Sequence, residues 1–76
     1  VQIPFAVTEE AHVVLGVFDV LGRKVRTLVA GRMAPGQYAL AWDGRDNASR
    51  TVGNGTYLVR LSVGGRSATS KVMLLK

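Results

Sequence analysis

The chain has 76 residues, no cysteine and a formal net charge of +5, from 10 lysines and arginines against 5 acidic residues. A chain of this length forms one small domain with a thin core, and without cysteine it has neither a disulfide framework nor a thiolate zinc site. The excess of basic over acidic residues is compatible with an anionic partner. The basic residues are spread along the chain, however, as is typical of solvated surface charge.

Apolar and polar residues alternate along nearly the whole chain, and no stretch has the 3.6-residue period of a helix. The strands expected from this alternation cover, in chain order, residues 1–7, 11–20, 23–29, 37–42, 56–63 and 66–76. Pro4 cannot donate a backbone hydrogen bond, which places the first strand at a sheet edge. The second strand is apolar on both faces, as is typical of a central strand that is covered on both sides.

The turn after the second strand carries its own signals. Asp19 can accept hydrogen bonds from nearby backbone groups, and Gly22 can adopt the positive φ of a tight turn. In the strand that follows, Val25 and Leu28 are the expected core contacts. Because they lie three residues apart, we expect a β-bulge or a twist between them. Residues 30–37 are expected to form the next loop, around a Pro-Gly turn.

Short strands at roughly ten-residue spacing, with turn signals between them, predict an all-β fold. The expected architecture is an antiparallel β-sandwich of six to seven strands, with a partly open barrel as the alternative. The one long connection, residues 43–55, is rich in Gly, Asp and Asn, and no internal repeat is expected. No apolar run approaches the roughly 20 residues of a membrane helix, so the chain is not expected to be transmembrane.

The sequence offers little for catalysis, because its five carboxylates all lie near turns. His12, the only histidine, lies on a strand that is expected to be central, which argues against a Ser–His–Asp site. Asp43, Asp46 and Asn47 supply oxygen atoms in a Gly-rich loop, as calcium requires. They lack the spacing of a calcium loop, however, and suit side chains that cap turns. We therefore expect no enzyme, no metal and no cofactor.

Three aromatic side chains could form a sugar-stacking platform: Tyr38, Trp42 and Tyr57. Each is in phase with the apolar positions of its strand, so we expect all three in the core. The same phase argues against a nucleic-acid surface, which needs exposed aromatic rings among basic residues.

Four segments in a fixed order carry a family resemblance: "VFDVLGRKVRTLV", "PGQYALAWDGRD", "VGNGTYLVRLSVGG" and the terminal "KVMLLK". Together they resemble the C-terminal sorting domains of type IX secretion, and equally the related immunoglobulin-like (Ig-like) domain of flagellar hook-capping proteins. The resemblance covers about residues 3–76 and implies a small Ig-like sandwich. The motif residues, expected to be structural, are Asp19, Gly22, Trp42, Asp43, Gly44, Asp46, Gly55 and Tyr57.

The type IX resemblance implies a non-enzymatic secretion signal and cell-surface attachment module, residues 1–76, at the end of a larger secreted protein. Its implied partners are secretion machinery proteins, a sorting peptidase and an anionic lipopolysaccharide, with no nucleic acid, and we expect a monomer. The implied location is extracellular or the outer cell surface, after transit through the periplasm. The recognition candidates are Arg23, Lys24, Lys71 and Lys76. An extended strand would point Lys71 and Lys76 to opposite faces.

Two other interpretations stay open. One is a glycan-binding accessory domain of a secreted hydrolase, which would need Trp42 and Tyr57 exposed and coplanar. The other is a structural Ig-like module of a hook-cap type protein. The sequence also departs from the family pattern at Ser49, where a glycine is usual. Either the turn needs a positive φ there and Ser49 carries about 1 kcal/mol of strain, or the loop is rearranged.

Overall fold

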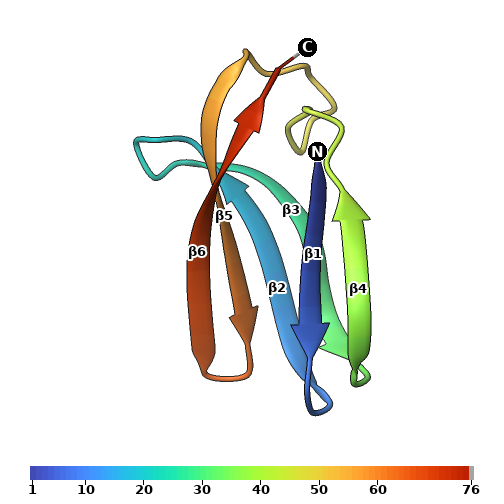
Figure 1. Ribbon diagram of the computed structural model, residues 1–76. Coiled ribbons are helices and arrows are strands. Elements are labelled where there is room, and N and C mark those ends of the chain that lie inside the picture. Colours follow the sequence, from blue (N-terminus) through green and yellow to red (C-terminus); the bar gives the residue numbers. More distant parts are fainter. Residues whose placement is uncertain (76) are drawn as a thin grey trace.

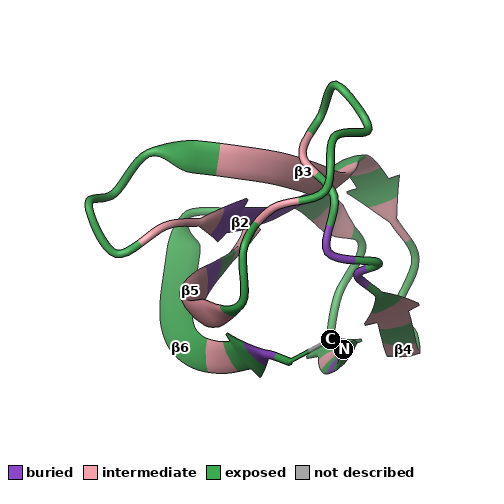
Figure 2. Ribbon diagram, turned by 90° about the horizontal axis from the view of Figure 1, so that it is seen from above, coloured by how far each residue is buried: buried purple, intermediate pink, exposed green. Residues whose placement is uncertain are grey.

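The computed structural model describes residues 1–75, which form two antiparallel sheets with six strands (Figure 1). The strands are β1 (Gln2–Val7), β2 (Ala11–Phe18), β3 (Lys24–Met33), β4 (Gly36–Ala41), β5 (Gly55–Val63) and β6 (Arg66–Leu74). One sheet pairs β1 with β4, and the other has the order β3-β2-β5-β6. Viewed along the strands, β1 and β4 lie against one side of the curved four-stranded sheet (Figure 2). The predicted all-β, Ig-like sandwich is confirmed.

β2 lies between β3 and β5, so its predicted central position is confirmed. Val13, Leu15 and Val17 point to the inner face, toward β1 and β4, and are fully buried. Val14 and Phe18 alternate with them and lie on the outer face, where both are only half-buried. The expectation that β2 is covered on both sides is therefore wrong, because within residues 1–75 only the inner face has a second sheet packed on it.

The pairing of β3 with β2 shifts register twice, once at Val25 and once at Leu28. Both of these extra residues pack against the core, so the predicted bulge is confirmed and doubled. β3 also extends to Met33, because residues 30–33 pair with the start of β2. The predicted loop 30–37 is therefore reduced to residues 34–35.

The core is centred on Trp42, which directly follows β4 and is 1% exposed. Its ring meets Tyr57 edge-on, with centroids 5.1 Å apart and planes at 72°. The other buried members of this cluster come from both sheets: Ile3, Leu15, Val17, Val59 and Leu74. Trp42 therefore joins the two layers, and its backbone N–H donates to the carbonyl of Val1 at 2.8 Å, which extends the β1–β4 ladder.

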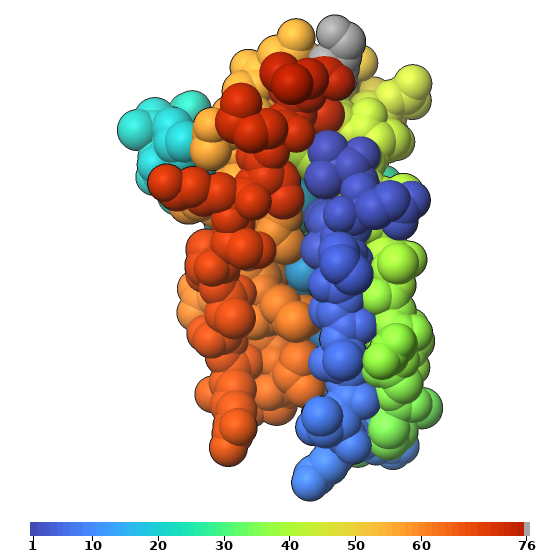
Figure 3. All heavy atoms as spheres, in the orientation of Figure 1, coloured from blue at the N-terminus to red at the C-terminus, as the bar shows by residue number. Residues whose placement is uncertain are grey.

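The inner face of the four-stranded sheet is not covered along its whole width, and β6 is its most exposed strand. Ala68 and Ser70 of β6 occupy inner-face positions but are exposed, and only Leu74 of that strand is buried. An open cleft of about 400 Å³ separates the β5–β6 turn from the end of β1 (Figure 3).

Pro4 lies on β1, which pairs only with β4, as predicted for an edge strand. Residues 1–75 include no helix that is long and apolar enough to cross a membrane.

Candidate functional site

The β2–β3 turn is built around the carboxylate of Asp19. Its Oδ1 accepts hydrogen bonds from the backbone N–H groups of Leu21 and Arg23, both at 2.9 Å, and its Oδ2 accepts one from Arg23 Nε at 2.8 Å. Gly22 has a φ of +83°, a conformation that strains any residue with a side chain. Asp19 and Gly22 thus stabilise the turn, and the Nε–H of Arg23 is hydrogen-bonded within the same turn.

Residues 46–50 repeat this turn in the long loop. Asp46 Oδ1 accepts from the backbone N–H groups of Ala48 and Arg50 at 2.9 Å, and Asp46 Oδ2 lies 3.3 Å from Arg50 Nε. Ser49, with a φ of 63°, stands where Gly22 stands in the first turn. The shared pattern is Asp-x-x-(Gly/Ser)-Arg. It is visible in the sequence, but the expectation of no repeat missed it because the repeat is only five residues long.

Because Ser49 adopts the left-handed conformation, the strain anticipated from the sequence is present. Changing Ser49→Gly should remove about 1 kcal/mol of strain, against an entropic loss of about 0.5–1 kcal/mol for glycine in the unfolded chain. We expect a free energy of unfolding between unchanged and about 0.5 kcal/mol higher, measured by urea denaturation. Ser49→Ala keeps the strain and serves as the control. A clear loss of stability in Ser49→Gly would contradict this account.

The two turns lower the pKa values of both aspartates below their ordinary value of 3.8. The largest cause at Asp19 is the hydrogen bond from the backbone N–H of Arg23, and at Asp46 that from the backbone N–H of Arg50. In each case the guanidinium of the same arginine adds to the effect. Each charged carboxylate therefore stabilises the folded chain above the pKa of the unfolded state, and this stabilisation is lost as pH falls through the lower folded pKa.

We predict that Asp19→Asn and Asp46→Asn are each less stable than the parent chain at pH 7. Asparagine keeps an Oδ1 acceptor but loses the charge, so the difference in melting temperature should shrink as pH falls from about 5 to 2. Thermal unfolding followed by circular dichroism over this range measures it. Glu9→Gln removes the same charge from an exposed position before β2 and controls for net charge. A difference that is constant with pH would contradict the prediction.

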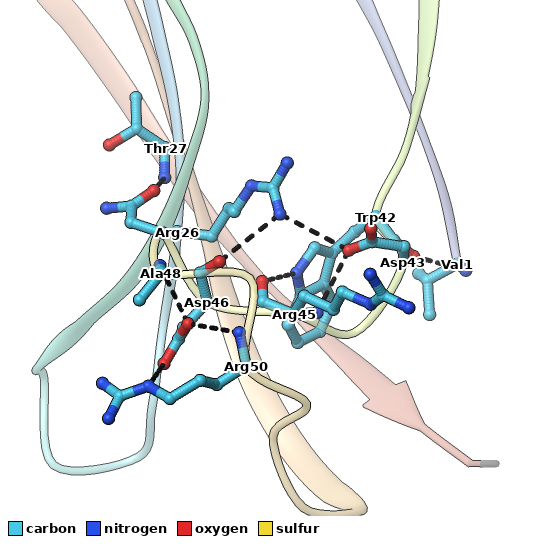
Figure 4. Close-up of polar contacts among 10 residues, drawn as sticks. Val1, Arg26, Thr27, Trp42, Asp43, Arg45, Asp46, Ala48 and Arg50 are labelled. Atoms are coloured by element: carbon cyan, nitrogen blue, oxygen red, sulfur yellow. Dashed lines mark hydrogen bonds and ion pairs between the residues drawn. The ribbon is translucent and has the colours of Figure 1, made fainter.

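The second turn docks on the bulged part of β3 (Figure 4). Asn47 donates its backbone N–H to the carbonyl of Val25 at 3.0 Å and accepts at Oδ1 from the backbone N–H of Thr27, also at 3.0 Å. Arg26 Nη1 lies 3.5 Å from Asp43 Oδ1. The loop thus covers part of the β3 edge, which would otherwise expose unpaired backbone groups. Nothing in the sequence indicated these roles of Asn47 and Arg26, because the docking joins segments 20 residues apart.

The run that starts at Trp42 is organised by short local contacts. Trp42 Nε1 donates to the carbonyl of Arg45 at 3.0 Å, and Asp43 Oδ1 accepts from the backbone N–H of Arg45 at 3.1 Å. Gly44, between them, is buried with a φ of +76°. Asp43 and Asp46 each face an arginine, and residues 1–75 present no cluster of three or more His, Asp or Glu side chains placed to hold a metal ion.

A second short repeat, Gly-x-Tyr, occurs at the start of β4 and again at the start of β5. The hydroxyl groups of Tyr38 and Tyr57 each donate at 2.6 Å to the carbonyl oxygen four residues earlier, and each tyrosine lies two residues after the glycine that begins its strand, Gly36 or Gly55. Such a bond from a tyrosine back to the upstream backbone resembles the tyrosine corner of Ig-like sandwiches.

The aromatic rings do not form a sugar-stacking platform. Trp42 is buried, and its ring is nearly perpendicular to that of Tyr57. Tyr38 is stacked on Phe5, with centroids 5.4 Å apart. The glycan-binding interpretation required Trp42 and Tyr57 to be exposed and coplanar, so this geometry counts against it.

The recognition candidates lie at different edges of the four-stranded sheet. Arg23 precedes β3, which begins at Lys24, and exposed Lys71 lies on β6 between exposed Ser70 and half-buried Val72. Lys24 Nζ sits 5.9 Å from the centroid of the Phe18 ring, within cation–π distance. Lys76 falls outside the described residues, so its predicted position relative to Lys71 stays a prediction.

Comparison with known proteins supports one of the two related families. The family model described as "FlgD Ig-like domain" matches residues 1–67. The chain belongs to the FlgD Ig-like domain family. No curated protein and no solved structure matches the chain. The family match supports the flagellar hook-capping side of the resemblance. The two Asp-x-x-(Gly/Ser)-Arg turns, the Trp42 run and both Gly-x-Tyr segments lie within the matched residues of this FlgD Ig-like domain.

Proposed function

We propose that this chain is a non-catalytic, structural Ig-like module of a hook-cap type protein, and that it acts outside the cytoplasm as one domain of a larger chain. The family match over residues 1–67 carries the proposal. The geometry supports it, because the polar groups of the motif are bonded to the chain's own backbone and build turns.

The proposal is tested by deleting residues 1–76 from the protein that carries them, in its own flagellated host, and measuring hooks by electron microscopy. We expect absent or shortened hooks, restored by the intact gene. Trp42→Ala should act like the deletion, because it removes the centre of the core. Hooks of normal length and number after the deletion would overturn the proposal.

A sorting role in type IX secretion is the second candidate, and one observation favours it. β6 pairs only with β5, so its outer edge offers backbone donors and acceptors to another chain, and its residues 66–71 are all exposed. Deleting residues 71–76 would not test this cleanly, because Leu74 is part of the core and unfolding alone could stop export.

A better test fuses residues 1–76 to the C-terminus of an exported reporter in a host that has the type IX route. Lys71→Glu reverses the charge of the exposed lysine of β6, and Arg66→Glu makes the same charge change at the start of β6, near the β5–β6 turn. Export that Lys71→Glu abolishes and Arg66→Glu preserves would support sorting. A reporter that stays in the periplasm with the unchanged domain would exclude it.

A further inference from the structure

The outer face of the four-stranded sheet bears positive charge with no acidic residue. None of the six strands contains Asp or Glu, and all five carboxylates lie in the connections between strands. Within residues 1–75 the ion pairs use Arg23, Arg26, Arg32 and Arg50. Lys24, Arg60 and Lys71 join none of these ion pairs, and the strand register places all three on the outer face.

The register also aligns two of these cations with two apolar residues in a row across the sheet. Lys24 pairs with Phe18, Phe18 with Leu58, and Leu58 with Lys71. This row, called here the cationic row, has a cation on each edge strand and two half-buried apolar side chains between them. With strands about 4.8 Å apart, the backbone positions of the two lysines are separated by about 14 Å.

Two small hollows adjoin the cationic row. One, of about 150 Å³, lies over Gly16 and is lined also by Val14, Phe18 and Arg60. The other, of about 210 Å³, lies between Phe18, Leu58 and Arg60. Gly16 leaves the first hollow open, since a Cβ there would come within 3.2 Å of the Phe18 ring. Each hollow is about the size of a few apolar carbon groups and has a guanidinium at its rim.

We propose that this face binds an acidic amphipathic polypeptide segment, in which carboxylates flank apolar side chains. The carboxylates would pair with Lys24, Lys71 and Arg60, and the apolar side chains would enter the hollows beside Phe18 and Leu58. Charge complementarity carries the choice of an acidic occupant, because the face has cations and no competing carboxylate. The apolar centre of the row favours an amphipathic segment over a purely charged one.

Other anionic partners fit this face less well. A nucleic acid is held mainly through many phosphate contacts made by lysine and arginine, whereas the face offers three cations that are free of ion pairs within residues 1–75. A lipid surface is contacted by protruding apolar groups, whereas this face is hollowed on both sides of Phe18. The inference goes beyond the structural role proposed above and does not depend on the flagellar assignment.

The test uses the 76-residue chain labelled with ¹⁵N and titrated with three capped peptides, (Glu-Glu-Leu-Leu)₂, (Lys-Lys-Leu-Leu)₂ and (Glu-Glu-Ser-Ser)₂, and with vesicles containing phosphatidylglycerol. In an extended (Glu-Glu-Leu-Leu)₂ chain, each face carries both carboxylates and leucines. We expect (Glu-Glu-Leu-Leu)₂ alone among the peptides to shift the amide signals of the cationic row. Binding should weaken when NaCl rises from 50 to 300 mM, because the charges are exposed and screened by salt.

Two matched variants decide where the peptide binds. Lys24→Glu/Lys71→Glu should weaken (Glu-Glu-Leu-Leu)₂ binding by about tenfold or more. Arg45→Glu/Arg66→Glu makes the same change in net charge away from the outer face and should leave binding within about twofold. Dispersed amide spectra establish that both variants are folded. Equal weakening in the two variants, shifts outside the outer face, equally tight binding of (Glu-Glu-Ser-Ser)₂ or (Lys-Lys-Leu-Leu)₂, or binding to vesicles alone would each overturn the proposal.

Discussion

Trp42→Ala should remove a large part of the free energy of unfolding, about 3–5 kcal/mol. A domain of 76 residues has a total of about 4–11 kcal/mol to lose. Trp42 is 1% exposed and contacts both sheets, so its removal leaves a cavity where the two layers join. The variant should therefore unfold at a much lower urea concentration than the parent chain. Circular dichroism during urea denaturation measures this, since the variant lacks the chain's only tryptophan and its fluorescence.

Trp42→Phe separates packing from hydrogen bonding at the same position. The smaller ring keeps much of the apolar contact but loses the Nε1–H donor, which leaves the carbonyl of Arg45 without that bond. We expect a loss of about 1–2 kcal/mol. If Trp42→Ala instead stayed within about 1 kcal/mol of the parent chain, Trp42 would not be the centre of the core.

The motifs that carry the family resemblance act mainly on the backbone. Asp19 and Asp46 each satisfy two backbone N–H groups, and Tyr38 and Tyr57 each satisfy one carbonyl. A small sandwich has a thin core, so fixed turns supply order that burial alone cannot. The same residue pattern can therefore mark a fold shared by proteins with different roles, and the match over residues 1–67 was needed to choose the family.

The strands were predictable because the alternation of apolar and polar residues indicates which side chains face the core. Two residues gave more detail: Leu28, three positions after Val25, indicated the bulge, and Ser49 indicated a strained turn. The end of β3 was not predictable, because residues 30–33 look like a loop locally and become a strand only by pairing with the start of β2. The docking of Asn47 on β3 is non-local in the same way.

The arrangement of the basic residues on the sheet was not predictable from the sequence either. The sequence placed Lys24 and Lys71 among the recognition candidates but gave no reason for them to act together, since 47 positions separate them in the chain. They lie in one row only because β2 and β5 stand between their strands in register. Arg60, which adjoins that row, was not among the candidates, because strand order cannot be read from alternation.

Leu15→Ala should destabilise the domain by about 2–5 kcal/mol, whereas Val14→Ala, one position away, should cost about 1 kcal/mol or less. The two side chains lie on the same strand and differ in face: Leu15 is fully buried against β1 and β4, and Val14 is half-buried on the outer face. Both faces of β2 are apolar in the sequence, so the sequence alone predicts similar losses of stability for Leu15→Ala and Val14→Ala. Urea denaturation of both variants measures the difference.

The size of that difference shows whether the outer face is open in the isolated chain. A large loss for Leu15→Ala and a small one for Val14→Ala would mean that one side of β2 is core and the other is available to a partner. If the two losses were equal, Val14 would be as well packed as Leu15. The outer face, with Phe18 and Leu58 on it, would then be covered, for example by self-association, and not free for an acidic segment. Repeating the measurement at two protein concentrations separates these cases, because self-association alone makes the stability depend on concentration.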